Sequence, residues 1–372
     1  MIRVHSLLRI VPILVLLLCF HTALADTVLF VATDRHASYE TVSDEHDDRP
    51  ESDHSQPPKG KMPVYDPDGN LIWHNHLTEV LQRVAADGIR PDVFLLGGDH
   101  VGGGGAGAID ATGYPFGAPF FSVRSVEAQV RYVFGDPIQC LFTYGSHDNH
   151  CTDPYDAAFF SGPVTQEGYY IYGITFAQMI YAADKEVVRK GYDGKDVADP
   201  NGISAQTASR HFLSWVRSLD DHLPIIIMSH VPLHAARGDN AGAWTWTQAL
   251  NTAAQDHDIL FLWGHNHSVE KDEERKAAEQ SHYLKLPGER LTVQSCYENE
   301  TGESVLKSGK DLITRRTSIR FTYMNAGYLL NGFGTVLTFS DADDRGHWGR
   351  LQVRRYSLDN AEPVSWTVSL RR

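Results

Sequence analysis

The sequence has few basic residues for its size, and this shortage restricts its partners. Its 33 Lys and Arg residues stand against 47 Asp and Glu residues, so the formal net charge is −14. A net negative charge disfavours polyanions such as DNA or RNA as bulk partners. An internal repeat, a coiled-coil heptad pattern and a domain-scale linker are also missing. The simplest organisation is therefore one domain over residues 26–372, with insertions at about 43–73 and 269–318.

A long apolar run is also lacking. Residues 10–20 are apolar, with Arg9 before them and Ala23-Leu24-Ala25 after them. This run is too short for a comfortable membrane span. The order of charged, apolar and small residues is instead typical of a secretory signal peptide, with cleavage predicted before Asp26. We therefore expect a secreted or periplasmic protein with no stable membrane span after cleavage. An uncleaved anchor is the alternative.

Cysteine is scarce, and a nucleotide-binding loop is missing. Beyond the expected signal peptide the cysteines are Cys140, Cys151 and Cys296. In an oxidising compartment Cys140 and Cys151 can bridge the loop between them, which leaves Cys296 odd, but spacing alone does not determine the pairing. The glycine-rich run at 101–107 has neither the spacing nor the Lys of a loop that cradles nucleotide phosphates.

The chain does contain short apolar segments of the kind that form buried strands. Five of them are each followed by Asp or His, namely 28–33, 93–96, 140–144, 225–228 and 259–263. Helical spacing of apolar residues is found between or before them at 74–86, 125–134, 207–219 and 244–256, and a charged helix is expected at 270–280. Shorter runs at 284–293, 318–323, 335–339 and 351–356 indicate the antiparallel half of a pair of mixed sheets.

The polar residues at the five strand ends are the candidate functional residues. They are Asp34 with His36, Asp99, His147 with Asp148, His230, and His265 with His267. In open α/β sheets, ligands bind outside the carboxyl ends of the strands. Mixed carboxylate and imidazole ligands suit Zn, Mn or Fe rather than Ca. So many ligands favour two metal ions, with Asp99 as the bridging carboxylate; such a pair activates a bridging water for attack on a phosphate ester.

Five motifs in this order resemble the calcineurin-like metallophosphoesterase superfamily. They are Asp-x-His, Gly-Asp, Gly-x-His-Asp, a single His after an apolar strand, and Gly-His-x-His, and they extend from Asp34 to His267. The resemblance implies an α/β fold in which two packed mixed β-sheets are flanked by helices, a four-layer α-β-β-α sandwich. It also implies a phosphatase or phosphodiesterase that uses two divalent metal ions on a small-molecule phosphate ester.

The resemblance also implies a role for each residue. Asp34, His36 and His267 would hold the first metal, and Asp99 would bridge the two. His230 and His265 would hold the second metal. His147 would be the catalytic histidine that donates to the phosphate or leaving oxygen, and Asp148 would orient it.

One position departs from the family pattern. Ser146 stands where the family has an asparagine that binds the second metal, and a serine hydroxyl is a shorter and poorer neutral ligand. A shifted register, with Asn149 as the ligand and His150 as the catalytic residue, is one alternative. In another, the second site has decayed, and the protein binds metal or ligand without turnover.

Overall fold

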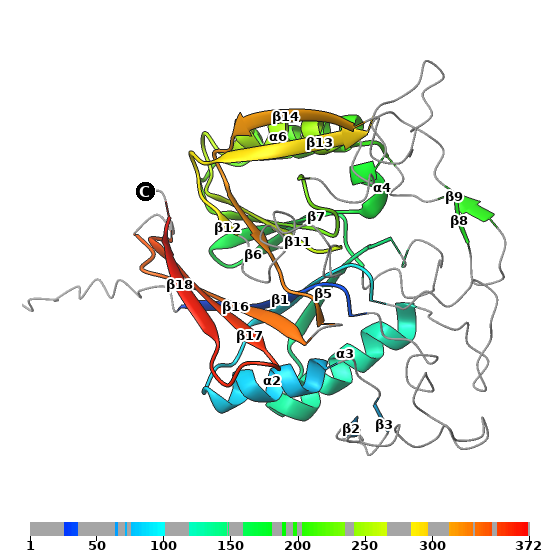
Figure 1. The fold of residues 1–372 in the computed structure, drawn as a ribbon, viewed down its shortest axis with the longest axis vertical. Coiled ribbons are helices and arrows are strands. Elements are labelled where there is room, and N and C mark those ends of the chain that lie inside the picture. Colours follow the sequence, from blue (N-terminus) through cyan, green and yellow to red (C-terminus); the bar gives the residue numbers. More distant parts are fainter. Residues whose placement is uncertain are drawn as a thin grey trace, which may run out of the picture.

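The computed structural model describes residues 26–35, 64–65, 71–72, 76–100, 119–146, 148, 159–180, 188–190, 196–198, 203–234, 242–265, 284–296, 312–329, 332–343 and 348–370. Within these residues the chain forms two six-stranded sheets, and helices cover their outer faces (Figure 1). Both sheets contain parallel and antiparallel neighbours. The predicted pair of mixed sheets flanked by helices is therefore confirmed.

The first sheet is built around β1, whose apolar residues are buried on both faces. Strand β1 pairs in parallel with β4 on one side and antiparallel with β16 on the other. The strand order is β18-β17-β16-β1-β4-β5. The bounds are β1 Thr27–Ala32, β4 Val93–Gly97, β5 Gln139–Thr143, β16 Phe333–Ser340, β17 Arg350–Ser357 and β18 Val364–Ser369.

The second sheet is centred on two parallel strands, β10 and β11, which pair from Ile225 with Ile259 to Met228 with Leu262. The strand order is β12-β15-β11-β10-β7-β6. The bounds are β6 Gly162–Gln166, β7 Tyr169–Ile174, β10 Ile225–Ser229, β11 Ile259–Trp263, β12 Leu284–Lys285 and β15 Thr322–Asn325. The expectation that 284–293 forms one continuous strand is wrong, because a turn at 286–289 separates β12 from the next strand.

The hydrophobic core has three layers. The middle layer lies between the sheets and contains Leu29, Leu95, Met228 and Leu262. The outer layers lie under α2 and α3 on the first sheet and under α4, α5 and α6 on the second (Figure 1). The helix bounds are α2 Leu77–Ala86, α3 Pro119–Phe134, α4 Phe176–Ile180, α5 Ala205–Val216 and α6 Ala243–Ala253.

Three two-stranded sheets complete the described part. The largest is the ribbon of β13 and β14, whose buried residues Leu291 and Val293 belong to the same apolar cluster as α6. Arg315 on β14 lies over the ring of Trp244, with its guanidinium carbon 4.8 Å from the ring centroid. The bounds are β2 Val64–Tyr65, β3 Leu71–Ile72, β8 Val188–Lys190, β9 Asp196–Ala198, β13 Arg290–Cys296 and β14 Leu312–Ser318.

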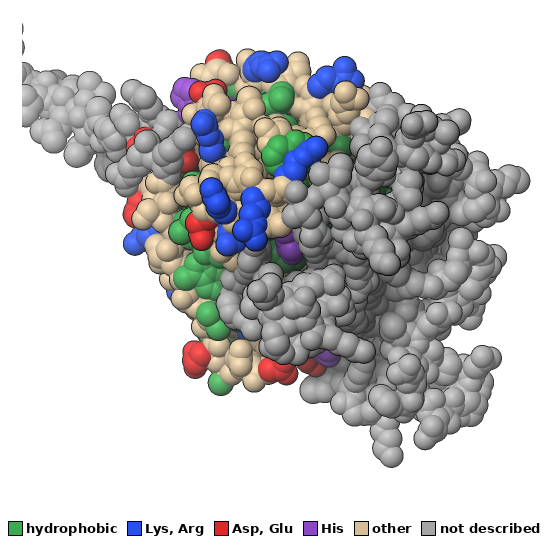
Figure 2. Space-filling model, turned by 45° about the horizontal axis from the view of Figure 1, so that its top comes forward, with side chains coloured by type: hydrophobic (Ala, Val, Ile, Leu, Met, Phe, Trp, Pro, Cys, Tyr) green, Lys and Arg blue, Asp and Glu red, His purple; other side chains and the backbone are tan. Residues whose placement is uncertain are grey.

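The net negative charge does not extend evenly over the surface. Figure 2 turns the side with β13 and β14 forward and shows Lys and Arg side chains across it. Arg290, Arg315, Arg316 and Arg320 of this region are exposed. Among the described helices, none is long and apolar enough to cross a bilayer.

The considered disulfide between Cys140 and Cys151 is not formed, because Cys140 is a free thiol. Its Sγ donates to the carbonyl oxygen of Ile138 at 3.4 Å, and the side chain packs against the apolar layer under α3. Burial raises the pKa of this thiol above its ordinary value. Cys140 therefore behaves as a packed apolar residue. Cys151 lies outside the described residues.

Candidate metal centre

Three candidate ligands share an uncommon backbone conformation. Asp34, Asp99 and His265 have φ angles of 51°, 51° and 73°, and each follows the end of a strand. A non-glycine residue rarely adopts positive φ, and such conformations concentrate at functional sites. The same turn at β1, β4 and β11 directs three side chains towards one place between the two sheets.

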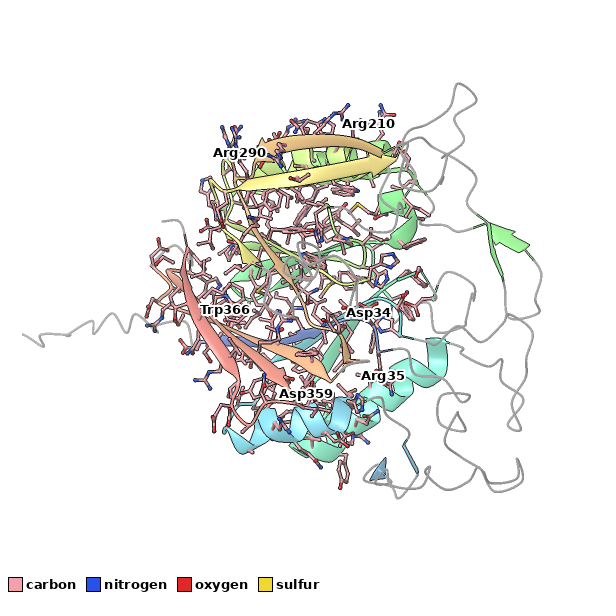
Figure 3. All side chains as sticks on the ribbon, viewed as in Figure 1. Asp34, Arg35, Arg210, Arg290, Asp359 and Trp366 are labelled. Atoms are coloured by element: carbon pink, nitrogen blue, oxygen red, sulfur yellow. The ribbon has the colours of Figure 1, made fainter. Side chains whose placement is uncertain are left out.

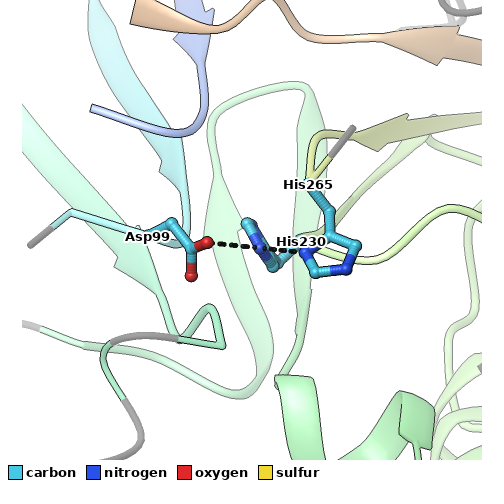
Figure 4. A group of neighbouring side chains, drawn as sticks. All are labelled: Asp99, His230 and His265. Carbon is cyan, nitrogen blue, oxygen red and sulfur yellow. Dashed lines mark hydrogen bonds and ion pairs between the residues drawn. The ribbon is translucent and has the colours of Figure 1, made fainter. Parts of the chain in front are cut away.

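Asp99, His230 and His265 form the centre of the cluster (Figure 4). His230 Nε2 lies 3.1 Å from Asp99 Oδ2 and 3.0 Å from His265 Nδ1. One ligand atom from each residue lies within 4.8 Å of the others, and all three residues are buried. The donor set of one carboxylate and two imidazoles fits Zn, Mn or Fe, so these residues are able to hold a divalent ion.

His230 is prepared for a ligand role by its second nitrogen. Its Nδ1 donates to the carbonyl oxygen of Gly97 at 3.0 Å, which orients the ring and leaves Nε2 facing the acidic residues. Burial by itself lowers the pKa of His230, but Asp99 and Asp34 outweigh burial and raise this pKa to about 9. A proton on His230 therefore offsets part of the charge of the two buried carboxylates, and a divalent cation at the same place would offset all of it.

Asp34 joins the cluster from β1. It is fully buried, and its Oδ1 lies 4.0 Å from His230 Nε2. Its Oδ2 accepts from the backbone N–H of His265 at 2.8 Å. Figure 3 shows Asp34 between the levels of the two sheets and Arg35 below it, towards α3. The predicted grouping of Asp34 with Asp99, His230 and His265 is therefore present.

Ser146 and Asp148 also lie at the site. Ser146 Oγ is 3.1 Å from Asp99 Oδ1 and 3.0 Å from Asp99 Oδ2, so the hydroxyl donates to the carboxylate. Asp148 accepts from the backbone N–H of His100 at 3.0 Å and of Gly145 at 2.9 Å. Asp148 thus ties together the loops that follow β4 and β5. Sequence reasoning did not foresee this role.

His36, His147 and His267 lie outside the described residues, as do Asn149 and His150 of the shifted register. Their assignments stay predictions. The first predicted metal is therefore represented by Asp34 and Asp99, and the second by Asp99, His230 and His265.

Two described residues near the cluster were not singled out from the sequence. The ring of Phe176 lies 6.4 Å from that of His230 and 6.3 Å from that of His265, so it forms an apolar wall beside both imidazoles. His100 Nε2 donates to the carbonyl oxygen of Thr143 at 2.9 Å, and burial lowers the pKa of His100. The position of His100 next to Asp99 was a sequence signal that His100 lies near the cluster. The sequence offers no such signal for Phe176, because α4 lies far from the motifs in the chain.

The family comparison agrees with this geometry. The model for calcineurin-like phosphoesterases matches residues 42–269, more than half of the chain, so the protein belongs to this family. The family implies divalent metal ions, and Asp99, His230 and His265 form a possible site for one. The matched range begins after Asp34 and contains Asp99, His230 and His265.

Two solved structures are similar over most of this chain. The 5′-nucleotidase precursor from Thermus thermophilus has 12% identity and a TM-score of 0.38, with 89% of this chain and 54% of that chain covered. The NAD nucleotidase of Haemophilus influenzae has 10% identity and a TM-score of 0.34, with 93% of this chain and 49% of that chain covered. The protein spans about half the length of these structures. Comparison with curated proteins found no match.

Two glycines with positive φ, one inside the cluster and one outside it, provide a test of how tightly the cluster is packed. Gly98 has φ +83°, and an added Cβ would lie 2.6 Å from Gly145 Cα and 2.8 Å from His230 Cβ. Gly88 has φ +73° but open space around it. We expect Gly88→Ala to lower the free energy of unfolding by ~1–2 kcal/mol, the penalty for left-handed backbone. Gly98→Ala should lower the free energy of unfolding further and also weaken Mn²⁺ binding, because the added Cβ would push against Gly145 and His230. Urea denaturation measures the free energy of unfolding, and metal titration measures the Mn²⁺ affinity. Equal effects of the two substitutions on both quantities would contradict the expected tight packing at Gly98.

Proposed function

We propose that this protein is an extracytoplasmic hydrolase of phosphate monoesters or diesters that works with two divalent metal ions. The observation that carries the proposal is the convergence of Asp99, His230 and His265 within 4.8 Å at buried strand ends, with Asp34 beside them. Membership of the calcineurin-like phosphoesterase family supports it. Mn, Zn and Fe all suit this donor set.

The proposed roles follow from the resemblance of the motifs to the family pattern. Asp34, His36 and His267 would hold one ion, His230, His265 and Ser146 would hold the other, and Asp99 would be shared by both. When bound, such a pair of ions would supply the Lewis acidity that activates water and the phosphate ester for hydrolysis near neutral pH.

The protein's own groups supply the other parts of catalysis. His147 donates a hydrogen bond or proton to the phosphate or leaving oxygen, and Asp148 orients it. The hydrogen bond that Gly145 N–H donates to Asp148 Oδ2 supports this role, because Gly145 lies two residues before His147 in the chain. The ring of Phe176 lies beside the two imidazoles and adds an apolar neighbour to both.

The second candidate function is binding without turnover. Ser146 favours it, because its hydroxyl donates to Asp99 and a serine is a poorer metal ligand than asparagine. In this case the second metal would be held weakly. The protein would keep the fold and bind a metal or a phosphate ligand without cleaving it.

We also propose that residues 26–372 form one domain with insertions at about 43–73 and 269–318. The arrangement of the two sheets supports this, because β1 from the start of the chain pairs with β16 from near its end. The ribbon of β13 and β14 falls within the second insertion and packs on the apolar layer around α6.

The enzymatic proposal predicts a metal-dependent activity. Chelator-treated protein should be inactive towards p-nitrophenyl phosphate and its bis ester, and Mn²⁺, Zn²⁺ or Fe²⁺ should restore hydrolysis. We expect Asp99→Asn to lower kcat/KM by more than ~100-fold, beyond the effect typical of an outer-shell partner. Asp341→Asn is the matched control, because Asp341 has φ 59° but lies outside the cluster. Inactivity on a broad ester panel, with metals verified as bound, would contradict the enzymatic proposal.

Replacement of Ser146 separates the two candidate functions. Ser146→Asn adds an amide oxygen where the family has one, so we expect the metal concentration for half-maximal activity to fall by roughly tenfold. Ser146→Ala removes the hydroxyl without adding a ligand and should not produce this gain. Activity that appears only in Ser146→Asn, with none in the native protein, would identify the native protein as a binder.

The proposed location predicts a processed chain. When the full chain is expressed in a bacterium with a periplasm, we expect the product in the periplasmic fraction to begin at Asp26. Ala25→Arg should block processing, because signal cleavage requires a small residue there. N-terminal sequencing of both proteins provides the measurement. Recovery of the native protein from the cytoplasm with residues 1–25 intact would count against an extracytoplasmic location.

A further inference from the structure

A short segment that begins with the last residue of β15 connects strand ends from both sheets. We call residues 325–329 the crossbar. Thr33, which precedes Asp34, donates from its backbone N–H to Gly327 O at 2.7 Å and from Oγ1 to the same oxygen at 3.0 Å. The N–H of Leu329 donates back to Thr33 O at 2.9 Å. Both the backbone N–H and the carbonyl oxygen of Thr33, the residue before Asp34, are therefore hydrogen-bonded to the crossbar.

The other end of the crossbar holds the strand that leads to His265. The N–H of Ala326 donates to Trp263 O at 2.8 Å, two residues before His265. Gly264 lies between them, and a Cβ there would collide with Thr33 Oγ1 and Asp34 Oδ2. The backbone before His265 therefore packs closely against Thr33 and Asp34. The crossbar is hydrogen-bonded to the strand ends that lead to both Asp34 and His265.

The crossbar is in turn held by Arg355. Its Nη1 donates to Asn325 Oδ1 at 3.1 Å, and its Nη2 donates to Asn325 O at 2.5 Å. Asn325 Oδ1 also accepts from the N–H of Gly327 at 2.7 Å, which closes the turn. The guanidinium thus fixes both the side chain and the backbone of Asn325, as a planar donor fork is suited to do.

The position of Arg355 shows that this contact crosses between the sheets. Arg355 lies on β17 of the first sheet, with apolar Leu351 and Val353 on the same face, whereas Asn325 ends β15 of the second sheet. Arg355 is 2% exposed, and burial lowers its pKa to about 9. A buried guanidinium is costly unless fixed acceptors compensate it, and Asn325 supplies two of them.

We propose that Arg355 is a positioning residue of the metal centre, which fixes the crossbar and thereby the placement of Asp34 relative to His265. The metal centre needs such a residue because its ligands come from both sheets: Asp34 and Asp99 follow strands of the first, and His230 and His265 follow strands of the second. A shift of one sheet against the other would separate them. This inference rests on the proposed function, because it assigns Asp34 and His265 as ligands.

The test compares Mn²⁺ binding by chelator-treated full-length variants, measured by calorimetry and corrected for the folded fraction. We expect Arg355→Met to weaken Mn²⁺ affinity by roughly tenfold, the lower end of the range for a direct hydrogen-bond partner of a ligand, because Arg355 acts on the ligands through Asn325. Arg355→Lys should recover part of this loss, because an ammonium group can donate to one of the two oxygens but lacks the planar fork.

Tyr356→Phe is the matched control. Tyr356 is the next residue on β17, is buried against the opposite face of the sheet, and donates from its hydroxyl to Asp87 Oδ2 at 2.7 Å. Its loss should lower stability and leave Mn²⁺ affinity unchanged. A purely structural role for Arg355 would give the same pattern as Tyr356→Phe.

Each outcome decides one of the two proposals. Mn²⁺ affinity of folded Arg355→Met within about twofold of the native value would overturn the positioning role and leave the proposed function intact. A native protein that binds no divalent ion would overturn the proposed metal centre, and this inference with it. Where Arg355→Met does not fold, Arg355→Lys carries the comparison with Tyr356→Phe, and unchanged affinity in Arg355→Lys would overturn the positioning role.

Discussion

The burial of two carboxylates beside one imidazole is the constraint on which the rest of this structure depends. Asp34 and Asp99 have exposed fractions of 0% and 2%, and His230 Nε2 lies 4.0 and 3.1 Å from their oxygens. Buried charges destabilise a protein unless opposite charge and hydrogen bonds compensate them. Positive charge is therefore needed at this place, either as a proton on His230 or as a metal ion. Metal binding and the integrity of this part of the fold are consequently linked.

The two-sheet architecture is what makes such a cluster possible. In each sheet the carboxyl ends of neighbouring parallel strands lie at the same edge. The residues that follow β1, β4, β10 and β11 therefore meet between the sheets. Backbone bonds then fix the turns: Asp34 N–H donates to Gly98 O at 3.0 Å, and Gly264 N–H donates to His230 O at 3.0 Å. The left-handed turns at Asp34, Asp99 and His265 persist because these bonds surround them.

Much of this arrangement was predictable because strand ends carry a strong local signal. An apolar run followed by Asp or His marked β1, β4, β5, β10 and β11, and the order of the motifs indicated the family. Strand β7 gave no such signal, although Tyr169 to Ile174 is buried on both faces, because neither Asp nor His follows it. The contribution of Arg355 was hidden for another reason: the sequence does not distinguish it from the neighbouring Arg354, and its partner Asn325 is brought to it only when both sheets are assembled.

By itself, the sequence determined the types of side chain at the strand ends, and with them the class of chemistry, because carboxylates and imidazoles have fixed preferences among metals. Hydrophobic periodicity likewise indicated the helices α2, α3, α5 and α6, although not α4. Only the tertiary structure decided that Asp34, 231 positions before His265 in the chain, accepts a hydrogen bond from its backbone. It also decided that Cys140 is packed as a thiol and that Arg355 reaches Asn325. These contacts join segments distant in the chain, and their distances follow from the packing of one sheet on the other rather than from any local pattern.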